Sequence, residues 1–154
     1  MMKLYRGTKK SVTSDRTLIN KYLDTPRVPR DTHPAIHEQA DLWFFERFGI
    51  KARSQTIFVS TCRKQAALYS GDDGSLLEIE PVGEYKLIYS AWVKDFLDHA
   101  IDGIQGEKPG DITSWLNGKH YCCVSSTEDL PQGFLGEAML FCEKYNVSVL
   151  PKQE

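Results

Sequence analysis

Cysteine pairs at metal-binding spacing, long apolar runs and a strong net charge are all missing from this chain of 154 residues. None of its four cysteines belongs to a CxxC pair, so we expect free thiols in a reducing cytoplasm, without a zinc knuckle or a redox motif. No window approaches the roughly 18 apolar residues of a membrane span, and the first residues lack the apolar segment of a signal peptide. The formal net charge of −2 gives no global reason to bind nucleic acid or an anionic membrane. We therefore expect a cytoplasmic protein that has no membrane partner.

Length and composition predict one globular domain over residues 1–154. Apolar residues make up 41% of the chain and charged residues 26%, which is typical of a folded protein and unlike a disordered one. A chain of this length can bury a real core. There is no internal repeat that would indicate a solenoid.

One long amphipathic helix is clearly marked between a cap at Thr32 or His33 and Gly49. Pro34 suits its first turn, and its apolar face comes from Ile36, Ala40, Trp43, Phe44 and Phe48. We expect shorter helices through Leu18, Ile19 and Tyr22 (capped by Ser14 or Asp15) and over residues 63–69, 92–100 and 112–116. In the third of these, Trp92, Phe96 and Leu97 would face inward.

Short strands are predicted at 3–6, 56–61, 76–79, 85–89, 121–124, 137–143 and 148–150. The helices lie early in the chain and the strands dominate its later part. This order indicates an α+β fold with a largely antiparallel sheet.

Three short segments carry candidate chemistry, and the first is Leu4-Tyr5-Arg6-Gly7. Arginine offers a planar fork of donors suited to a pyrophosphate, and glycine lets a ligand approach the backbone closely. Taken alone, Arg6 is better explained as a surface arginine at the end of a strand.

The second segment is Phe58-Val59-Ser60-Thr61-Cys62, in which a strand ends in hydroxyl residues and turns into a helix. Ser60 and Thr61 either cap that helix or line a pocket beside it. The third segment places Glu137 at the start of an apolar strand. Glu137 is then in solvent at the rim of the sheet or buried with a partner, and a buried carboxylate in a cleft is a candidate site residue.

Together the three segments resemble the R-S-E class of mono-ADP-ribosyltransferases, which includes bacterial toxins and phage enzymes. That family carries an arginine on its first core strand, a Ser-Thr-Ser motif where a strand enters a helix, and a catalytic glutamate opening a late strand. The chain offers Tyr5-Arg6-Gly7, Ser60-Thr61-Cys62 and Glu137 in the same order. The resemblance implies a split β-sheet with helices packed around a central NAD cleft.

The resemblance also implies a reaction, in which the nicotinamide N-glycosidic bond of NAD is cleaved. NAD is then the substrate, and the reaction needs no metal. Arg6 would hold the pyrophosphate, and the Gly7 backbone would approach the nicotinamide amide. Ser60 and Thr61 would order the ribose side, and Glu137 would stabilise the developing cation. A stacking role for an aromatic residue on the nicotinamide ring falls to Tyr69. The catalytic set is thus Arg6, Ser60 and Glu137.

Two departures from the family keep other functions open. Cys62 replaces the last hydroxyl of the serine motif, and Leu135 stands where arginine-modifying members carry Glu or Gln. We therefore weigh an ADP-ribosyltransferase with an unknown acceptor, more readily a protein than nucleic acid, against an NAD glycohydrolase. A binding module that has lost the chemistry and an unrelated α+β domain are further alternatives.

The acceptor would dock at Thr25–Arg30 or at Ile101–Asn117, where Trp115 is the aromatic candidate. The remaining feature of note is the spacing of His33 and His37, which could place a metal on one helix face. With no third ligand nearby in the sequence, we expect both to face solvent and no metal to bind.

Overall fold

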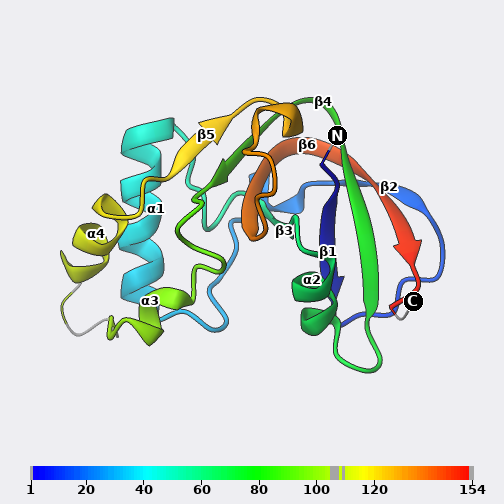
Figure 1. The fold of residues 1–154 in the computed structure, drawn as a ribbon, viewed down its shortest axis with the longest axis horizontal. Coiled ribbons are helices and arrows are strands. Elements are labelled where there is room, and N and C mark those ends of the chain that lie inside the picture. Colours follow the sequence, from blue (N-terminus) through cyan, green and yellow to red (C-terminus); the bar gives the residue numbers. More distant parts are fainter. Residues whose placement is uncertain (1, 105–107, 109, 153–154) are drawn as a thin grey trace.

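The computed structural model describes residues 2–104, 108 and 110–152, which form a mixed α/β fold whose described strand pairings are all antiparallel (Figure 1). The strands are β1 (Leu4–Thr8), β2 (Arg16–Ile19), β3 (Ile57–Ser60), β4 (Ser75–Tyr89), β5 (Cys122–Val124) and β6 (Glu137–Leu150). The α-helices are α1 (Pro34–Phe48), α2 (Arg63–Ser70), α3 (Asp98–Ile101) and α4 (Gly110–Asn117), and two 3₁₀ turns are η1 (Lys21–Leu23) and η2 (Thr127–Asp129). The expected α+β class and its antiparallel sheet are confirmed.

The sheet is organised by its two longest strands, β4 and β6. β6 pairs with β2, β3 and β4, while β1 pairs with β3 and β4, so that β1, β3, β6 and β4 close a ring of pairings. Each long strand was expected as two short ones. In β4 the register shifts between Val82 and Tyr85 without ending the strand, since a bulge accommodates the glycine there. β6 likewise runs unbroken from Glu137 to Leu150.

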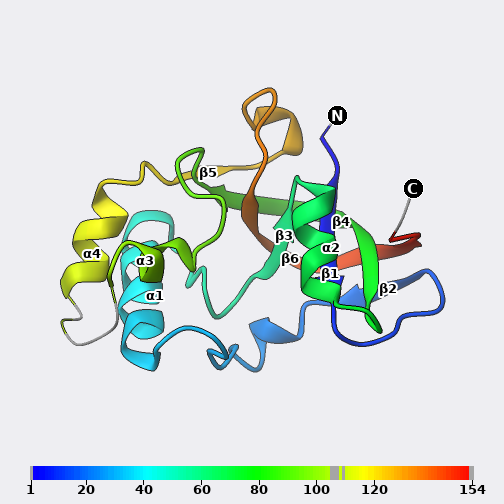
Figure 2. The same cartoon turned by 60° about the horizontal axis from the view of Figure 1, so that its bottom comes forward.

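Alternate residues of the long strands supply two separate apolar cores. Leu87 and Leu140 belong to the core inside the sheet, whereas their neighbours Ile88 and Met139 pack against the helices. This division follows from the alternation of side chains across a strand. Figure 1 and Figure 2 show α1, α3 and α4 grouped at one end of the sheet, while α2 packs against β1.

The prediction of α1 is confirmed, and His33 is its cap. The His33 Nδ1 atom accepts a hydrogen bond from the Ala35 backbone N–H at 3.1 Å, Pro34 occupies the first turn, and Gly49 ends the helix at a φ of 73°. That left-handed conformation favours glycine. In the part of the chain that the structure describes, no helix is long and apolar enough to cross a membrane.

The helix predicted through Leu18, Ile19 and Tyr22 is wrong. Leu18 and Ile19 lie in β2, because the far half of β6 offers an edge on which this segment pairs, with Leu18 opposite Tyr145. The following turn, η1, is capped by Asn20 rather than by Ser14 or Asp15. Tertiary pairing thus overrides the local helical pattern.

The predicted helix at 92–100 shrinks to α3, at Asp98–Ile101. The Asp95 side chain accepts a hydrogen bond from the Leu97 N–H at 2.8 Å, which favours a turn over a helix at this point. Phe96 is fully buried as expected, but Trp92 is 71% exposed and does not face inward.

Candidate functional site

A cleft of about 550 Å³ opens where β1 and β3 diverge. In the pairing of these two strands, Tyr5 lies opposite Ser60. Two residues before Ser60, the Phe58 carbonyl accepts a hydrogen bond from the side chain of Arg6, whose Nη1 lies 2.9 Å away. A volume of this size suits a small organic ligand. The side chains at its wall come from β1, β3, β6, α1, α2 and the loops at 20–32 and 94–97.

Five of the six residues singled out from the sequence line this cleft, although they come from four separate segments. They are Arg6, Gly7, Ser60, Tyr69 and Glu137. Arg6 is not a surface arginine, because it is half-buried and its side chain donates to a strand carbonyl. Glu137 does not lie in solvent, because it forms an ion pair with a buried partner.

The sixth residue, Thr61, lies behind the cleft wall. Its hydroxyl donates to the Phe134 carbonyl at 2.7 Å and accepts from the Gly136 N–H at 3.1 Å. Both partners belong to the loop that leads into β6. Thr61 therefore fixes the backbone immediately before Glu137 rather than offering its hydroxyl to the cleft.

Ser60 lies at the end of β3, where the chain turns toward α2. Its Oγ donates to Gln65 Oε1 at 2.8 Å and accepts from the Cys62 N–H at 3.0 Å. α2 begins at Arg63, and its N-cap residue Cys62 makes no side-chain capping bond. The alternative that Ser60 or Thr61 serves as the N-cap of α2 is therefore not realised.

Gly7 is required by the packing of α2 on β1. A Cβ atom at this position would lie 1.9 Å from the Ala66 carbonyl oxygen and 2.9 Å from the Ser70 nitrogen. Both are backbone atoms of the helix, which a side chain could not displace cheaply. Gly7 thus sets how closely α2 approaches the cleft, whatever it does toward a ligand.

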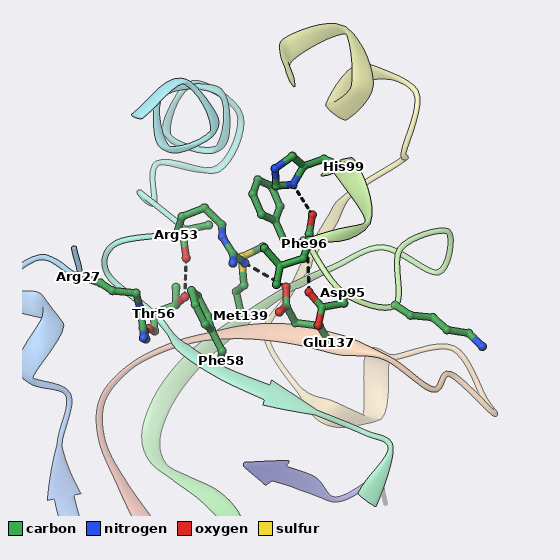
Figure 3. A network of polar contacts seen from close by, with 12 residues as sticks. Arg27, Arg53, Thr56, Phe58, Asp95, Phe96, His99, Glu137 and Met139 are labelled. Atoms are coloured by element: carbon green, nitrogen blue, oxygen red, sulfur yellow. Dashed lines mark hydrogen bonds and ion pairs between the residues drawn. The ribbon is translucent and has the colours of Figure 1, made fainter. Parts of the chain in front are cut away.

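Glu137 forms a buried ion pair with Arg53, a residue that sequence reasoning missed. Arg53 Nη1 lies 3.0 Å from Glu137 Oε1, and the two side chains are only 6% and 14% exposed. The Arg53 guanidinium lies 4.1 Å from the ring centroids of both Phe58 and Phe96 (Figure 3). Nothing in the local sequence distinguishes Arg53 from a surface arginine, so only the assembled fold shows this contact.

Burial raises the pKa of Glu137, while the charge of Arg53 opposes that rise. The nearby Asp95 carboxylate adds to the rise, and a hydrogen bond from the Phe96 backbone counters it. Burial disfavours the charged form of a carboxyl group, and an adjacent cation favours it. The site thus holds a carboxylate of raised proton affinity against a fixed cation.

Asp41 on α1 anchors the segment that carries Arg53. Its Oδ1 accepts from the N–H groups of Arg53 and Ser54 at 2.8 and 3.1 Å, and its Oδ2 lies 3.8 Å from His37 Nε2. Burial lowers the pKa of His37, against the pull of Asp41. His37 is half-buried at the cleft, so the expectation that it faces solvent is wrong, whereas His33, the helix cap, is exposed as expected.

The connector before α1 also belongs to the cleft wall. The Arg27 guanidinium lies 3.9 Å from the ring centroids of both Tyr22 and Phe58, and its Nη2 donates to the Thr56 carbonyl at 2.8 Å. Burial lowers the pKa of Arg27 to about 10, so the group stays charged at neutral pH. Arg27 is therefore half-buried in the cleft wall, whereas Arg30 is exposed.

The second segment at which we expected an acceptor to dock, Ile101–Asn117, shows little that supports this role. Trp115 is half-buried, and its Nε1 donates to Asp102 Oδ2 at 2.7 Å. Part of the segment, at 105–107 and 109, lies outside the described residues.

No group of three or more His, Cys, Asp or Glu side chains that could hold a metal is found within residues 2–104, 108 and 110–152. Comparisons of the chain with protein-family models, curated proteins and solved structures find no match.

Proposed function

We propose that the protein cleaves the nicotinamide N-glycosidic bond of NAD and transfers ADP-ribose to an acceptor. The observation that carries the proposal is Glu137, a buried carboxylate that faces a cleft shared with Arg6 and Ser60. A buried carboxylate with a specific charge partner in a cleft is a site candidate on physical grounds. The order of the three motifs along the chain supports the choice of reaction.

In this reaction the bond between the ribose C1′ and the nicotinamide nitrogen breaks, and its electron pair leaves with neutral nicotinamide. The ribose becomes oxocarbenium-like, as in glycoside hydrolysis. The Glu137 oxygen not paired with Arg53 would hydrogen-bond the ribose 2′-hydroxyl, and its negative charge would stabilise the cation. The acceptor then attacks C1′ and loses its proton. A pre-positioned charge in a site shielded from water can lower a barrier by about 3 kcal/mol.

Other residues at the cleft take supporting roles in this proposal. Ser60 would border the ribose, held by Gln65, and Tyr69 would stack on the nicotinamide ring. Arg6 would bind the pyrophosphate through the donors that its bond to the Phe58 carbonyl leaves free.

The experiment is to incubate pure protein with NAD and measure free nicotinamide, for wild type and for Glu137→Gln. We expect release by wild type and a loss of at least about 100-fold in the variant, with NAD binding retained. Glu143→Gln is the matched control, since Glu143 lies on the same strand but is exposed. Equal release by wild type and Glu137→Gln would overturn the proposal.

A second candidate, hydrolysis of NAD by water, is favoured by Leu135. This side chain is 59% exposed two residues before Glu137 and has no hydrogen-bonding group for an arginine acceptor. The two reactions differ in their product. Hydrolysis releases free ADP-ribose in equal amount to nicotinamide, whereas transfer to an acceptor leaves less free ADP-ribose than nicotinamide.

A further inference from the structure

Asp95 is a second carboxylate in the cleft, and it lies next to Glu137. The carbonyl of Lys94, the residue before it, accepts hydrogen bonds from the Glu137 N–H and from Gln65 Nε2, both at 2.8 Å. The backbone of Phe96, the residue after it, hydrogen-bonds the Glu137 carboxylate. Both chain neighbours of Asp95 are thus bound to Glu137, and Figure 3 shows the two acidic side chains next to each other.

The protein uses only part of the Asp95 side chain. Oδ1 accepts a hydrogen bond from the Leu97 N–H at 2.8 Å, which fixes the turn at this point. Oδ2 has no hydrogen-bond or ion-pair partner among the described residues, and Asp95 is half-buried in the lining of the cleft. An ionised carboxylate oxygen without a partner can accept a hydrogen bond or a proton from a bound molecule.

The two carboxylates differ in their surroundings. Glu137 is paired with Arg53 at 3.0 Å, and this cation favours its charged form. Asp95 has no such cation within ion-pair distance in the part of the chain that the structure describes. Glycoside hydrolysis commonly uses two acidic groups with different tasks, one of which takes the proton of the attacking group. Different surroundings assign different tasks to two carboxylates in one site.

Two other groups in the lining of the cleft could also accept a proton. Asp31 is exposed in the loop before α1. His37 is engaged by Asp41, whose Oδ2 lies 3.8 Å from His37 Nε2. Neither is joined to Glu137 by the backbone contacts that hold Asp95, so the geometry favours Asp95.

We infer that Asp95 takes the proton from the group that attacks the ribose C1′. The attacking atom forms its bond to C1′ as the electron pair of the bond between C1′ and nitrogen leaves with nicotinamide, and the proton moves to Asp95 Oδ2. The positive charge of the nicotinamide ring and the negative charge of Asp95 are both neutralised in this step. The role rests on the proposed function, since without cleavage of NAD there is no attacking group.

The test is nicotinamide release by wild type and by Asp95→Asn, with and without sodium azide. Asparagine keeps an oxygen for the Leu97 N–H but cannot take the proton, so we expect release to fall at least about tenfold. Azide attacks without losing a proton and needs no base. It should therefore raise release by this variant several-fold and give ADP-ribosyl azide, identified by mass spectrometry.

Two further variants serve as controls. Azide should not restore Glu137→Gln, because it does not replace the charge that stabilises the cation. Asp98→Asn, which lies at the start of α3 and outside the lining of the cleft, should release nicotinamide as wild type does. If Asp95→Asn folds poorly, Asp95→Ser takes its place, since a serine hydroxyl can also accept from the Leu97 N–H and leaves more room for azide.

The inference is overturned if a folded Asp95 variant releases nicotinamide as fast as wild type. It is also overturned if azide restores nothing in a variant whose thermal midpoint matches that of wild type, because Asp95 would then act on the structure of the site only. Release that Glu137→Gln loses and Asp95→Asn keeps would count against Asp95 alone. No release by wild type would overturn the proposed function and this role with it.

Discussion

The guanidinium group of Arg53 lies 3.0 Å from the carboxylate of Glu137, across 84 residues of sequence and in a nearly fully buried setting. Asp41 holds the Arg53 backbone, and the rings of Phe58 and Phe96 hold its side chain. Glu137 is therefore positioned by a cation that is itself fixed from two directions. Under the proposed function, stability and activity would therefore depend on the same pair of side chains.

Replacing Arg53 by Met should lower the free energy of unfolding by about 3 kcal/mol near neutral pH, because it leaves a buried carboxylate without its partner. The loss should shrink in acid. Removing the cation raises the pKa of Glu137 further, and a carboxyl whose folded pKa is raised costs stability as the pH rises through that pKa. Denaturant unfolding at about pH 5 and about pH 8 measures both effects.

The double variant Arg53→Met with Glu137→Gln supplies the control for this prediction. It should be more stable than Arg53→Met alone at about pH 8 and nearly equal to it in acid, because no buried charge remains to be neutralised. A destabilisation of Arg53→Met that is the same at both pH values would show that the pair contributes packing and not charge.

The pH dependence of nicotinamide release should report the same carboxyl group. The proposed reaction requires ionised Glu137, so we expect its rate to fall as the pH drops through an apparent pKa above the ordinary glutamate value. Arg53→Lys keeps a cation and should leave this acid limb near that of wild type, whereas Arg53→Met should move it to higher pH. Initial rates across the pH range at saturating NAD check this. An acid limb unmoved by Arg53→Met would contradict the pairing as the control of Glu137.

Much of the fold could be predicted because local signals and tertiary contacts agree in it. The helix between His33 and Gly49 carries a cap, a proline, an apolar face and a terminal glycine, all of which point to one structure. At Leu18 and Ile19 the local signal and the tertiary contacts disagree. The spacing of these residues fits a helix, but they form a strand because they pair with the edge of β6. Such a preference depends on a strand more than 120 residues away.

The candidate site divides in a similar way. Ser60 and Glu137 could be found because each stands at a change of local structure, at the end of β3 and the start of β6. Arg6 could be found because a glycine follows it on a short strand. Arg27 and Arg53 could not, because their significance lies in aromatic rings and a carboxylate supplied by distant segments. Arginine is common on surfaces, so its sequence neighbours do not show that it is buried.

Gly7→Ala should destabilise the protein by about 2 kcal/mol, because the added methyl group meets the Ala66 carbonyl and α2 must shift away from β1. Thermal unfolding measures the effect. Gly110→Ala is the matched control, since a Cβ there meets no atom within 4 Å and Gly110 does not have a positive φ. Equal midpoints for the two variants would show that α2 moves at no cost.

Thr61→Val tests whether Thr61 positions Glu137 through the backbone. The substitution keeps the shape of the side chain but leaves the Gly136 N–H without its partner, so we expect a cost of about 1–2 kcal/mol in stability. Since Gly136 directly precedes Glu137, kcat for nicotinamide release should fall about tenfold, with little change in the Kd for NAD. Thr61→Ser keeps the hydroxyl and should retain both properties. If Thr61→Val instead weakened NAD binding and left kcat unchanged, its hydroxyl would act on the ligand and not on the loop before β6.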